Sequence, residues 1–210
     1  MTIQNTATIY NTPGIYNQET GVYNGAGVYN GGDINIEIDG YKYKCVKINN
    51  KIWINENLKA NLGSNKWYDN NPSYYEPLKC GRLYTYDSIQ IINNYLQNNL
   101  HGWRVAEHND YVELFSLVNH AYELKADIDF WKDSLPGTDI FGFGAIPAGS
   151  YGITFNIFQN FGIFCGWFTK DLYSDSRAYV PSLNETDYLN TNNNSNRYDN
   201  MLPLRLCKDA

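Results

Sequence analysis

The feature that most constrains the fold is a change of hydrophobic period along the chain. Residues 34–54 alternate apolar and polar side chains, which is the period of a strand with one face on a core. Turn signals at Asp39-Gly40 and at Asn49-Asn50 divide this segment into three parts. The sequence therefore predicts a meander of three short antiparallel strands.

Two helices are predicted in the middle of the chain. The first starts at Ser88, a residue type that caps helices, and stops before Gly102. The second starts near Asn109, and acidic residues in its first turns suit the helix dipole. Its apolar stripe has the i, i+3, i+4, i+7 spacing of a helix that faces a core: Tyr111, Leu114, Phe115 and Val118.

The last third of the chain has no helical period. Glycine-rich aromatic segments there predict strands, and they lie at 141–144, 162–168 and 204–207. The asparagine-rich stretch 184–200 predicts an exposed loop. Helices in mid-chain between strands at both ends predict an α+β domain with two helices and antiparallel sheets, spanning residues 34–210.

Residues 1–33 differ from the rest because they repeat a short unit of one β-branched residue, one Tyr and one Asn, usually after a Gly. The tyrosines recur at intervals of six, seven and six residues: Tyr10, Tyr16, Tyr23 and Tyr29. Units this short cannot bury a core alone, so they need copies from other subunits or a surface on which to lie. We interpret the segment as an extended arm for oligomerisation or anchoring. The alternative is a disordered low-complexity tail.

Charge and composition exclude several classes of protein. The formal net charge is −6 and no basic block is present, which argues against nucleic acid as a partner. No run of 18 apolar residues predicts a membrane span, and residues 1–5 do not begin a signal peptide. We therefore expect the product to stay in the cytoplasm of the cell that makes it. The four cysteines form no CxxC pair and histidine is scarce, so no metal site is expected.

Six short motifs follow one another between about residue 34 and residue 209. They are WINENLK at 53–59, GRLYTY at 81–86, GWRV at 102–105, FGAIPAG at 143–149, GWFT at 166–169 and LRLCKD at 204–209. In this order they resemble the motifs of the Fibrobacter succinogenes major paralogous domain. The chain departs from that family at Ala106, where the family has proline, and at Gly144, where it has serine.

The resemblance implies a C-type-lectin-like fold, in which the terminal strands pair and long loops carry a surface. It places Cys45 and Cys207 on neighbouring strands at the base of the domain, as two small buried thiols or as a bonded pair. Calcium-dependent sugar binding is not expected, because Glu76-Pro77-Leu78 lacks the asparagine of the calcium-lectin loop signature.

The sequence offers no catalytic constellation. Formylglycine-generating oxidases share the fold implied by the resemblance, but they use paired reactive cysteines, and no close pair is present here. Carboxylate pairs such as Asp127 with Asp129 lie in polar, loop-like surroundings. No serine or cysteine is arranged beside a histidine. We predict that the protein is not an enzyme and holds no cofactor.

Aromatic residues in the predicted loops are the candidate ligand contacts. Flat rings beside amides offer stacking and adaptable hydrogen bonds to a sugar or a protein surface. The candidates are Trp67, Tyr68, Tyr74, Tyr75 and Tyr173. The alternative is ordinary packing of the loops.

Two functions compete on this basis. The first is a structural or binding protein of a bacteriophage virion, assembled in the host cytoplasm as a head fibre, decoration or tail-associated subunit. Its arm would oligomerise the chain or dock it on other virion proteins, and its lectin-like domain would contact a host glycan or protein. The second is a bacterial surface or secreted adhesin or carbohydrate-binding module. An enzyme of the same fold and an intracellular binding module are further alternatives, and gene neighbourhood would separate the first two.

Overall fold

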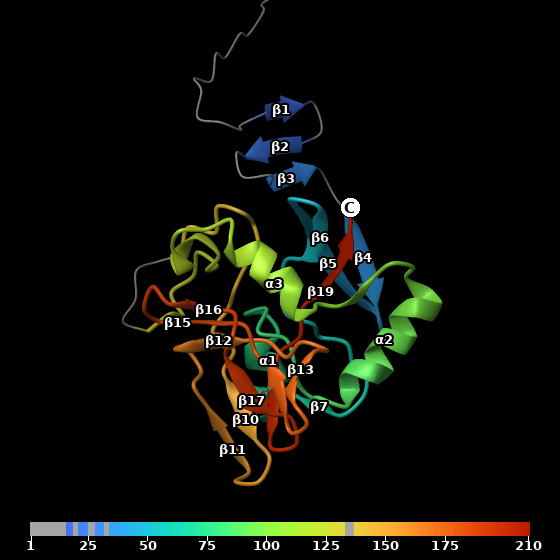
Figure 1. Cartoon of the computed structure of the whole chain (residues 1–210), viewed down its shortest axis with the longest axis vertical. Helices are drawn as coiled ribbons and strands as arrows, with labels where there is room; N and C mark the ends of the chain where they lie inside the picture. The colour runs from blue at the N-terminus through green and yellow to red at the C-terminus, as the bar shows by residue number, and fades with distance from the viewer. Residues whose placement is uncertain (1–15, 19–20, 25–27, 32–33, 133–136) are drawn as a thin grey trace, which may run out of the picture.

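The predicted α+β class is confirmed. The computed structural model describes residues 16–18, 21–24, 28–31, 34–132 and 137–210. These residues form mostly antiparallel sheets with few helices (Figure 1). The helices are α1 (Pro72–Tyr75), α2 (Ser88–Asn99) and α3 (His108–Phe115), with 3-10 turns η1 (Tyr68–Asn70) and η2 (Ala121–Glu123).

The largest sheet joins both ends of the described chain. Its strand order is β1-β2-β3-β5-β6-β19-β9, and β4 pairs with β5 beside this path. The strands are β1 (Tyr16–Gln18), β2 (Gly21–Asn24), β3 (Val28–Gly31), β4 (Asn35–Ile38), β5 (Tyr41–Ile48), β6 (Lys51–Ile54), β9 (Arg104–Val105) and β19 (Leu206–Asp209). The predicted three-stranded meander is confirmed as β4, β5 and β6. The last strand, β19, lies between β6 and β9.

The central strands of this sheet are buried on both faces. Val46, Trp53 and Cys207 belong to a core cluster that also contains the buried face of α3. Tyr43 and Ile54, on the opposite face, belong to a second cluster with the buried face of α2. The sequence alternation predicts one buried face, but apolar side chains pack on both faces here, while Lys42 and Lys44 in the first half of β5 stay exposed.

The expected adjacency of Cys45 and Cys207 is wrong. Cys45 lies on β5 and Cys207 on β19, and β6 separates the two strands, because Trp53 pairs with Val46 on one side and with Cys207 on the other. The two thiols also pack into different clusters on opposite faces of the sheet. Both are free cysteines.

Both predicted helices are present, with different starts. Ser88 is the first residue of α2 and not its cap, which is Asp87. The Ser88 hydroxyl instead donates to the carbonyl oxygen of Ser64 at 2.8 Å. Helix α3 starts at His108, and the Asp110 carboxylate accepts from the N–H of Glu107 at 2.7 Å. Val118 lies beyond the end of α3, although it packs against the first cluster.

Three smaller sheets carry the loops. One has the order β11-β10-β18-β8-β7, the second β12-β15-β16 and the third β13-β14-β17. The strands are β7 (Asn65–Lys66), β8 (Leu83–Thr85), β10 (Ser150–Gly152), β11 (Ile157–Gln159), β12 (Phe164–Gly166), β13 (Leu172–Ser174), β14 (Arg177–Tyr179), β15 (Ser182–Asn184), β16 (Leu189–Asn190), β17 (Asn194–Asn196) and β18 (Asn200–Leu202).

Two of the predicted C-terminal elements are corrected. The segment 141–144 is a turn and not a strand, because Gly142 and Gly144 have φ values of 68° and 64°, outside the strand region. The segment 184–200 is not one exposed loop, because it supplies β16 and β17 and the start of β18. Asparagine supports short strands here through side-chain hydrogen bonds to neighbouring backbone.

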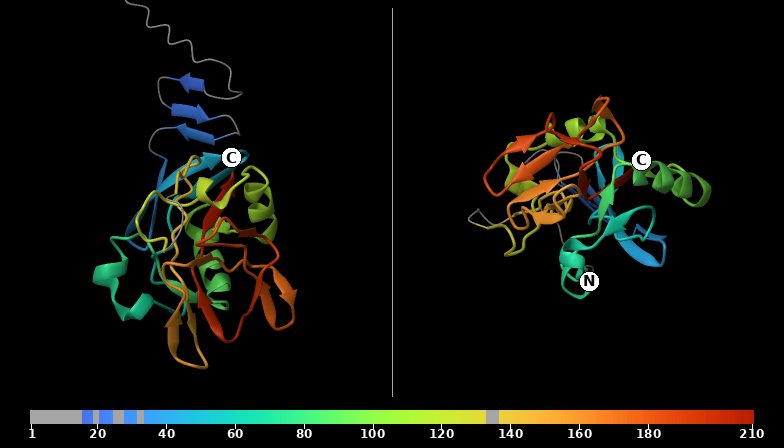
Figure 2. Two further views of the ribbon diagram at one scale, coloured as in Figure 1. Left: turned by 90° about the vertical axis from the view of Figure 1, so that its left-hand side faces the viewer. Right: turned by 90° about the horizontal axis from the view of Figure 1, so that it is seen from below.

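The repeat segment is paired with itself and with the domain. In the register of β1, β2 and β3, Tyr16 pairs with Tyr23 and Tyr23 pairs with Tyr29. Strand β3 then pairs with β5, where Tyr29 is opposite Lys47. Tyr10 lies outside the described residues. Figures 1 and 2 place these three strands at one end of the molecule, beside the C-terminus, with β10 and β11 at the other end.

Among the described residues no helix is long and apolar enough to cross a membrane.

Candidate binding surface

Three of the five candidate ligand contacts are buried, as the alternative of ordinary loop packing predicts. Trp67, Tyr68 and Tyr75 retain only 5%, 8% and 7% of their exposure. The Tyr68 ring centroid lies 5.2 Å from that of Tyr75 and 5.0 Å from that of Phe158. Residues 67–75 therefore fold over the sheet that contains β10 and β11 and form a third core cluster with it. These rings stabilise the loop and have little face left for a ligand.

The other two candidates are exposed, on different elements. Tyr74 on α1 is 53% exposed, and Tyr173 on β13 is 52% exposed. Tyr74 packs edge-on against Tyr75, with centroids 4.8 Å apart, so the buried ring fixes the orientation of the exposed one. Tyr173 is the candidate that lies within a wider polar and aromatic surface.

That surface, the β13–β14–β17 surface, begins with a row of three rings. The ring of Tyr173 meets the ring of Tyr179 edge-on at 5.3 Å, and Tyr179 stacks on the imidazole of His108 at 3.9 Å. Two hydrogen-bonding contacts hold His108. Its backbone N–H donates to the Asp171 carboxylate at 2.6 Å, and its Nε2 lies 3.1 Å from the carbonyl oxygen of Thr191. These contacts fix the His108 end of the row, and the Tyr173 end is exposed.

Arginines and amides complete the β13–β14–β17 surface. Arg177 donates to Asn194, whose strand pairs with β14. The guanidinium of Arg197 lies 4.6 Å from the ring centroid of Tyr198 and 5.3 Å from that of Tyr86. Tyr198 is 56% exposed. Exposed rings beside guanidinium and amide groups can stack on a flat ligand and bond to its polar groups.

The tip of the β10–β11 hairpin is the most exposed apolar feature among the described residues. Phe155 is 84% exposed, and Ile153 and Ile157 flank it. The local sequence Ile-Thr-Phe-Asn-Ile alternates like an ordinary strand, so it gives no signal that distinguishes a projecting tip from a buried strand.

The motif residues converge on a buried arginine. Arg205 has no exposed area, and its guanidinium donates to the carbonyl oxygens of Ile54 at 3.0 Å, Phe143 at 2.7 Å and Gly144 at 2.5 Å. Its Nε donates to Asn57 Oδ1 at 2.8 Å. We call this set the Arg205 hub. It ties the segments around β6 and residue 143 to the last strand.

A fourth motif segment, through Trp167, and the residue before another motif, Cys80, meet the hub at Asn57. Its Oδ1 also accepts from the indole N–H of Trp167 at 2.9 Å, and its Nδ2 donates to the carbonyl oxygen of Cys80 at 2.9 Å. Gly144 fits here because a Cβ atom would lie 2.4 Å from the carbonyl oxygen of Asn55. The motifs that carry the family resemblance therefore build the interior, and their residues here are structural.

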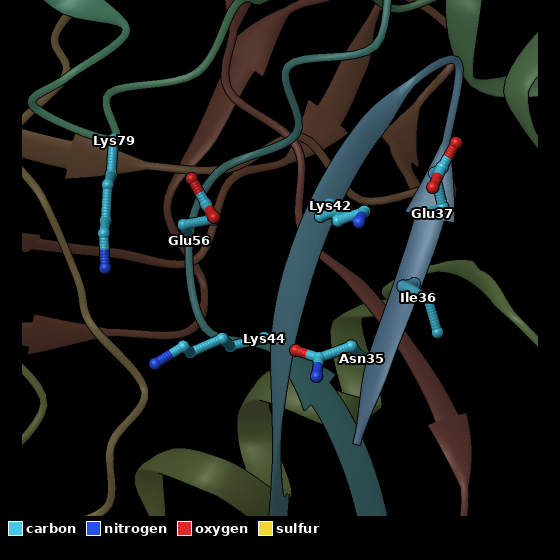
Figure 3. A pocket seen from close by; sticks show the side chains of 7 residues that line it. All are labelled: Asn35, Ile36, Glu37, Lys42, Lys44, Glu56 and Lys79. Carbon is cyan, nitrogen blue, oxygen red and sulfur yellow. The ribbon is translucent and has the colours of Figure 1, made fainter. Parts of the chain in front are cut away.

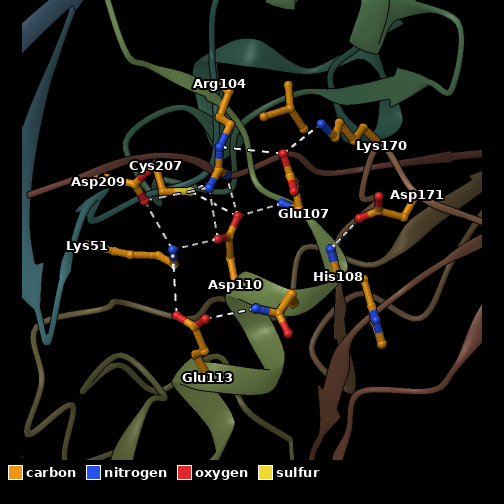
Figure 4. A network of polar contacts seen from close by, with 12 residues as sticks. Lys51, Arg104, Glu107, His108, Asp110, Glu113, Lys170, Asp171, Cys207 and Asp209 are labelled. Carbon is orange, nitrogen blue, oxygen red and sulfur yellow. Dashed lines mark hydrogen bonds and ion pairs between the residues drawn. The ribbon is translucent and has the colours of Figure 1, made fainter.

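A second polar cluster surrounds Asp110 at the start of α3 (Figure 4). Its carboxylate accepts from Arg104 Nη2 at 2.9 Å and lies 3.0 Å from Lys51 Nζ. Burial alone would raise the pKa of the Asp110 carboxyl, but the hydrogen bonds from Arg104 and from the backbone outweigh burial and lower this pKa to about 2. The Cys207 thiol donates to the same carboxylate at 3.3 Å. Figure 4 shows these side chains pointing toward one another.

The thiols are not activated as nucleophiles. Burial raises the pKa of Cys207 well above its ordinary value, and it raises the pKa of Cys80 to about 12 and that of Cys45 to about 11. Thiols of such high pKa are protonated at neutral pH, whereas reactive cysteines are thiolates. Within the described part of the chain, no group of three or more histidines, cysteines and acidic residues is placed to hold a metal ion.

Comparison with known proteins adds no relative. No family model, no curated protein and no solved structure matches this chain.

Proposed function

We propose that this protein is a non-enzymatic structural and binding subunit of a bacteriophage particle. Residues 1–33 anchor or oligomerise the chain, and the α+β domain, with a C-type-lectin-like fold, is displayed outward for attachment to a host surface. The observation that carries the proposal is the placement of the repeat strands. They extend the largest sheet at the end of the molecule opposite the β10–β11 hairpin (Figures 1 and 2).

The register of the repeat supports its role in assembly. Tyr16, Tyr23 and Tyr29 occupy directly paired positions in β1, β2 and β3. Each tyrosine falls at the same register position of its strand, so the repeat length matches one strand with its turn. A unit repeated at this length can be matched by the same unit of another copy of the chain, as closed symmetric assemblies require.

The interior supports the lectin-like part of the proposal. The last strand pairs with β6, so strands from opposite ends of the domain lie in one sheet. Four motif segments also meet at the Arg205 hub. These buried hydrogen bonds fix the interior on which the exposed β13–β14–β17 surface is built.

The proposal is tested with full-length variants of the repeat. Tyr16, Tyr23 and Tyr29 are changed together to serine, and the control changes the neighbouring Asn17, Asn24 and Asn30 to serine. Mass in solution is measured by light scattering, and incorporation is measured in particles purified from infected cells.

We expect the tyrosine variant to lose self-association or incorporation while the melting temperature of its domain is retained. The asparagine control is expected to keep both. A tyrosine variant that keeps its oligomeric state and still joins the particle would overturn the role of the arm. Finding the protein on uninfected bacteria would support the adhesin instead.

A further inference from the structure

Two cavities share lining residues, and the first of them lies beside the β4–β5 hairpin. One has a volume of about 580 Å³ and is lined by Lys42 and Lys44 from β5, while the other has a volume of about 480 Å³ and is lined by Lys59. Glu56 and Lys79 line both cavities. Neither contains a residue of the β13–β14–β17 surface. We call the pair the lysine cavity.

The hairpin fixes the positions of two lysines. Lys42 and Lys44 are two residues apart on β5, so they lie on one face of the strand, while Tyr43 between them is fully buried. Strand β4 pairs with this part of β5, with Glu37 opposite Lys42. Figure 3 shows Lys44 and Lys79 on one side of the view, with Glu56 above Lys44, and Lys42 on the other side toward Glu37.

The third lysine stands on a constrained backbone. Lys79 has a φ of 59°, and its N–H donates to the carbonyl oxygen of Glu76 at 2.9 Å. The next residue, Cys80, accepts through its carbonyl oxygen from Asn57 of the Arg205 hub. A left-handed conformation in a residue other than glycine persists only where the surrounding structure holds it. The lysine cavity is therefore preformed at this position.

Glu56 supplies a buried acceptor at the centre of the lysine cavity. It is 5% exposed, and its Oε2 lies 3.0 Å from Lys59 Nζ. This ion pair does not give Oε2 a hydrogen bond of good geometry. Buried acceptors are almost always satisfied, so Oε2, which has almost no exposed area, would gain a partner if the Glu56 side chain turned toward a hydroxyl donor in the cavity.

The lining of the lysine cavity has a positive balance of charge, whereas the whole chain is negative. The formal net charge is −6. Within the described residues Lys42, Lys44 and Lys79 form no ion pair, whereas Lys51, Lys59 and Lys170 do. The four lysines that line the two cavities outnumber the three glutamates there, Glu37, Glu56 and Glu76, and this positive balance favours an anion.

We propose that the lysine cavity binds an acidic oligosaccharide. Carboxylate or sulfate groups of the sugar contact Lys42, Lys44 and Lys79, and its hydroxyl groups donate to Glu56 and to Glu76, which lines the second cavity. A sugar acid offers both kinds of group on one ring, whereas an acidic peptide lacks the dense hydroxyl donors. This binding does not depend on which particle or surface carries the protein.

The test measures binding of oligogalacturonic acid to the purified full-length chain by isothermal titration calorimetry. The comparison ligands are its neutral methyl ester and poly-glutamate. One double variant carries Lys44→Gln and Lys79→Gln. A control of equal charge change carries Lys132→Gln and Lys208→Gln, both outside the lysine cavity. Thermal unfolding verifies that both variants are folded.

We expect the Lys44/Lys79 variant to bind oligogalacturonic acid roughly tenfold more weakly and the control to bind as the parent does, with affinity falling as salt rises. The proposal is overturned if the parent does not bind, if the methyl ester binds equally well, or if both variants lose affinity alike. Equal binding of poly-glutamate would make the ligand an acidic peptide and would also overturn it.

Discussion

The two arginines that organise the domain, Arg205 and Arg104, are held in opposite ways. All four acceptors of Arg205 are neutral oxygen atoms, and three of them are backbone carbonyls. The side chain of Arg104 is 25% exposed and its guanidinium forms ion pairs with Asp110, Glu107 and Asp209. One centre depends on backbone geometry and the other on charge.

This difference predicts how each centre responds to its environment. Carbonyl dipoles do not titrate, so the hydrogen bonds of the Arg205 hub are independent of pH and little affected by salt. The Asp110 cluster depends on an ionised carboxylate near the surface, so acid weakens it. The hub is therefore expected to determine whether the domain folds, and the Asp110 cluster to tune its stability.

The largest effect is expected from Arg205→Met. It removes the donor to four buried oxygen atoms, which is expected to cost about 3–5 kcal/mol of unfolding free energy. Urea denaturation followed by tryptophan fluorescence measures the loss. Arg177→Met, at an exposed arginine, is the control and should stay within about 0.5 kcal/mol of the parent. A loss at Arg205 no larger than at Arg177 would show that the Arg205 hub does not determine whether the domain folds.

Asn57→Ala is expected to cost about 2–3 kcal/mol, because it leaves donors of Arg205 and Trp167 without an acceptor in the interior. Trp167→Phe removes one of these donors and keeps the ring. A double-mutant cycle between the two, measured in urea, should be non-additive, since both changes break the same hydrogen bond. Additive losses would mean that Asn57 acts through packing alone.

Asp110→Asn addresses the charged centre and its pH dependence. The pKa of Asp110 in the folded protein, about 2, lies below the ordinary value of 3.8. The resulting stability, about 2 kcal/mol, is present above pH 4 and is lost as the pH falls through about 2. Acid titration of the unfolding midpoint should show this slope in the parent and a flatter one in the variant. The same slope in both would assign the acid sensitivity to other carboxyls.

The smallest expected effect comes from Asp139→Asn. Burial raises the pKa of Asp139 from 3.8 to about 6, while its carboxylate accepts from the N–H of Gly144 at 2.9 Å. A raised pKa in the folded state means that stability falls as the pH rises from about 4 through 6. The amide keeps an acceptor without the charge, so we expect a gain of about 1 kcal/mol at pH 7 and none at pH 4. Chemical denaturation at both pH values checks this, and a loss at pH 7 would contradict it.

Local sequence pattern predicts the elements whose neighbours are close in the chain. The meander of β4, β5 and β6 follows from alternation and turn residues, and α2 and α3 follow from helical spacing. The Arg205 hub does not follow, because alternation in Leu204-Arg205-Leu206 would place the arginine on a solvent face. Leu204 and Leu206 pack into the second cluster, and Arg205 is buried on the opposite face beside Phe143 and Trp167 of the first cluster.

The candidate ligand contacts were separable only by tertiary structure. Tyr74 and Tyr75 are adjacent and chemically identical, yet one is exposed and the other is buried against Tyr68. The local sequence does not predict which ring is buried, because α1 is a single turn and is too short to show a hydrophobic period. The lysine cavity was equally hidden, since Lys79 and Lys44 are distant in the chain.

The position of β19 has a consequence for how the protein folds. Strand β19, residues 206–209, lies between β6 and the edge strand β9, and Lys51 pairs with Asp209 across 158 positions of sequence. Contacts of such long sequence separation slow folding. Removal of residues 206–209 would therefore leave β6 and β9 without the strand that joins them.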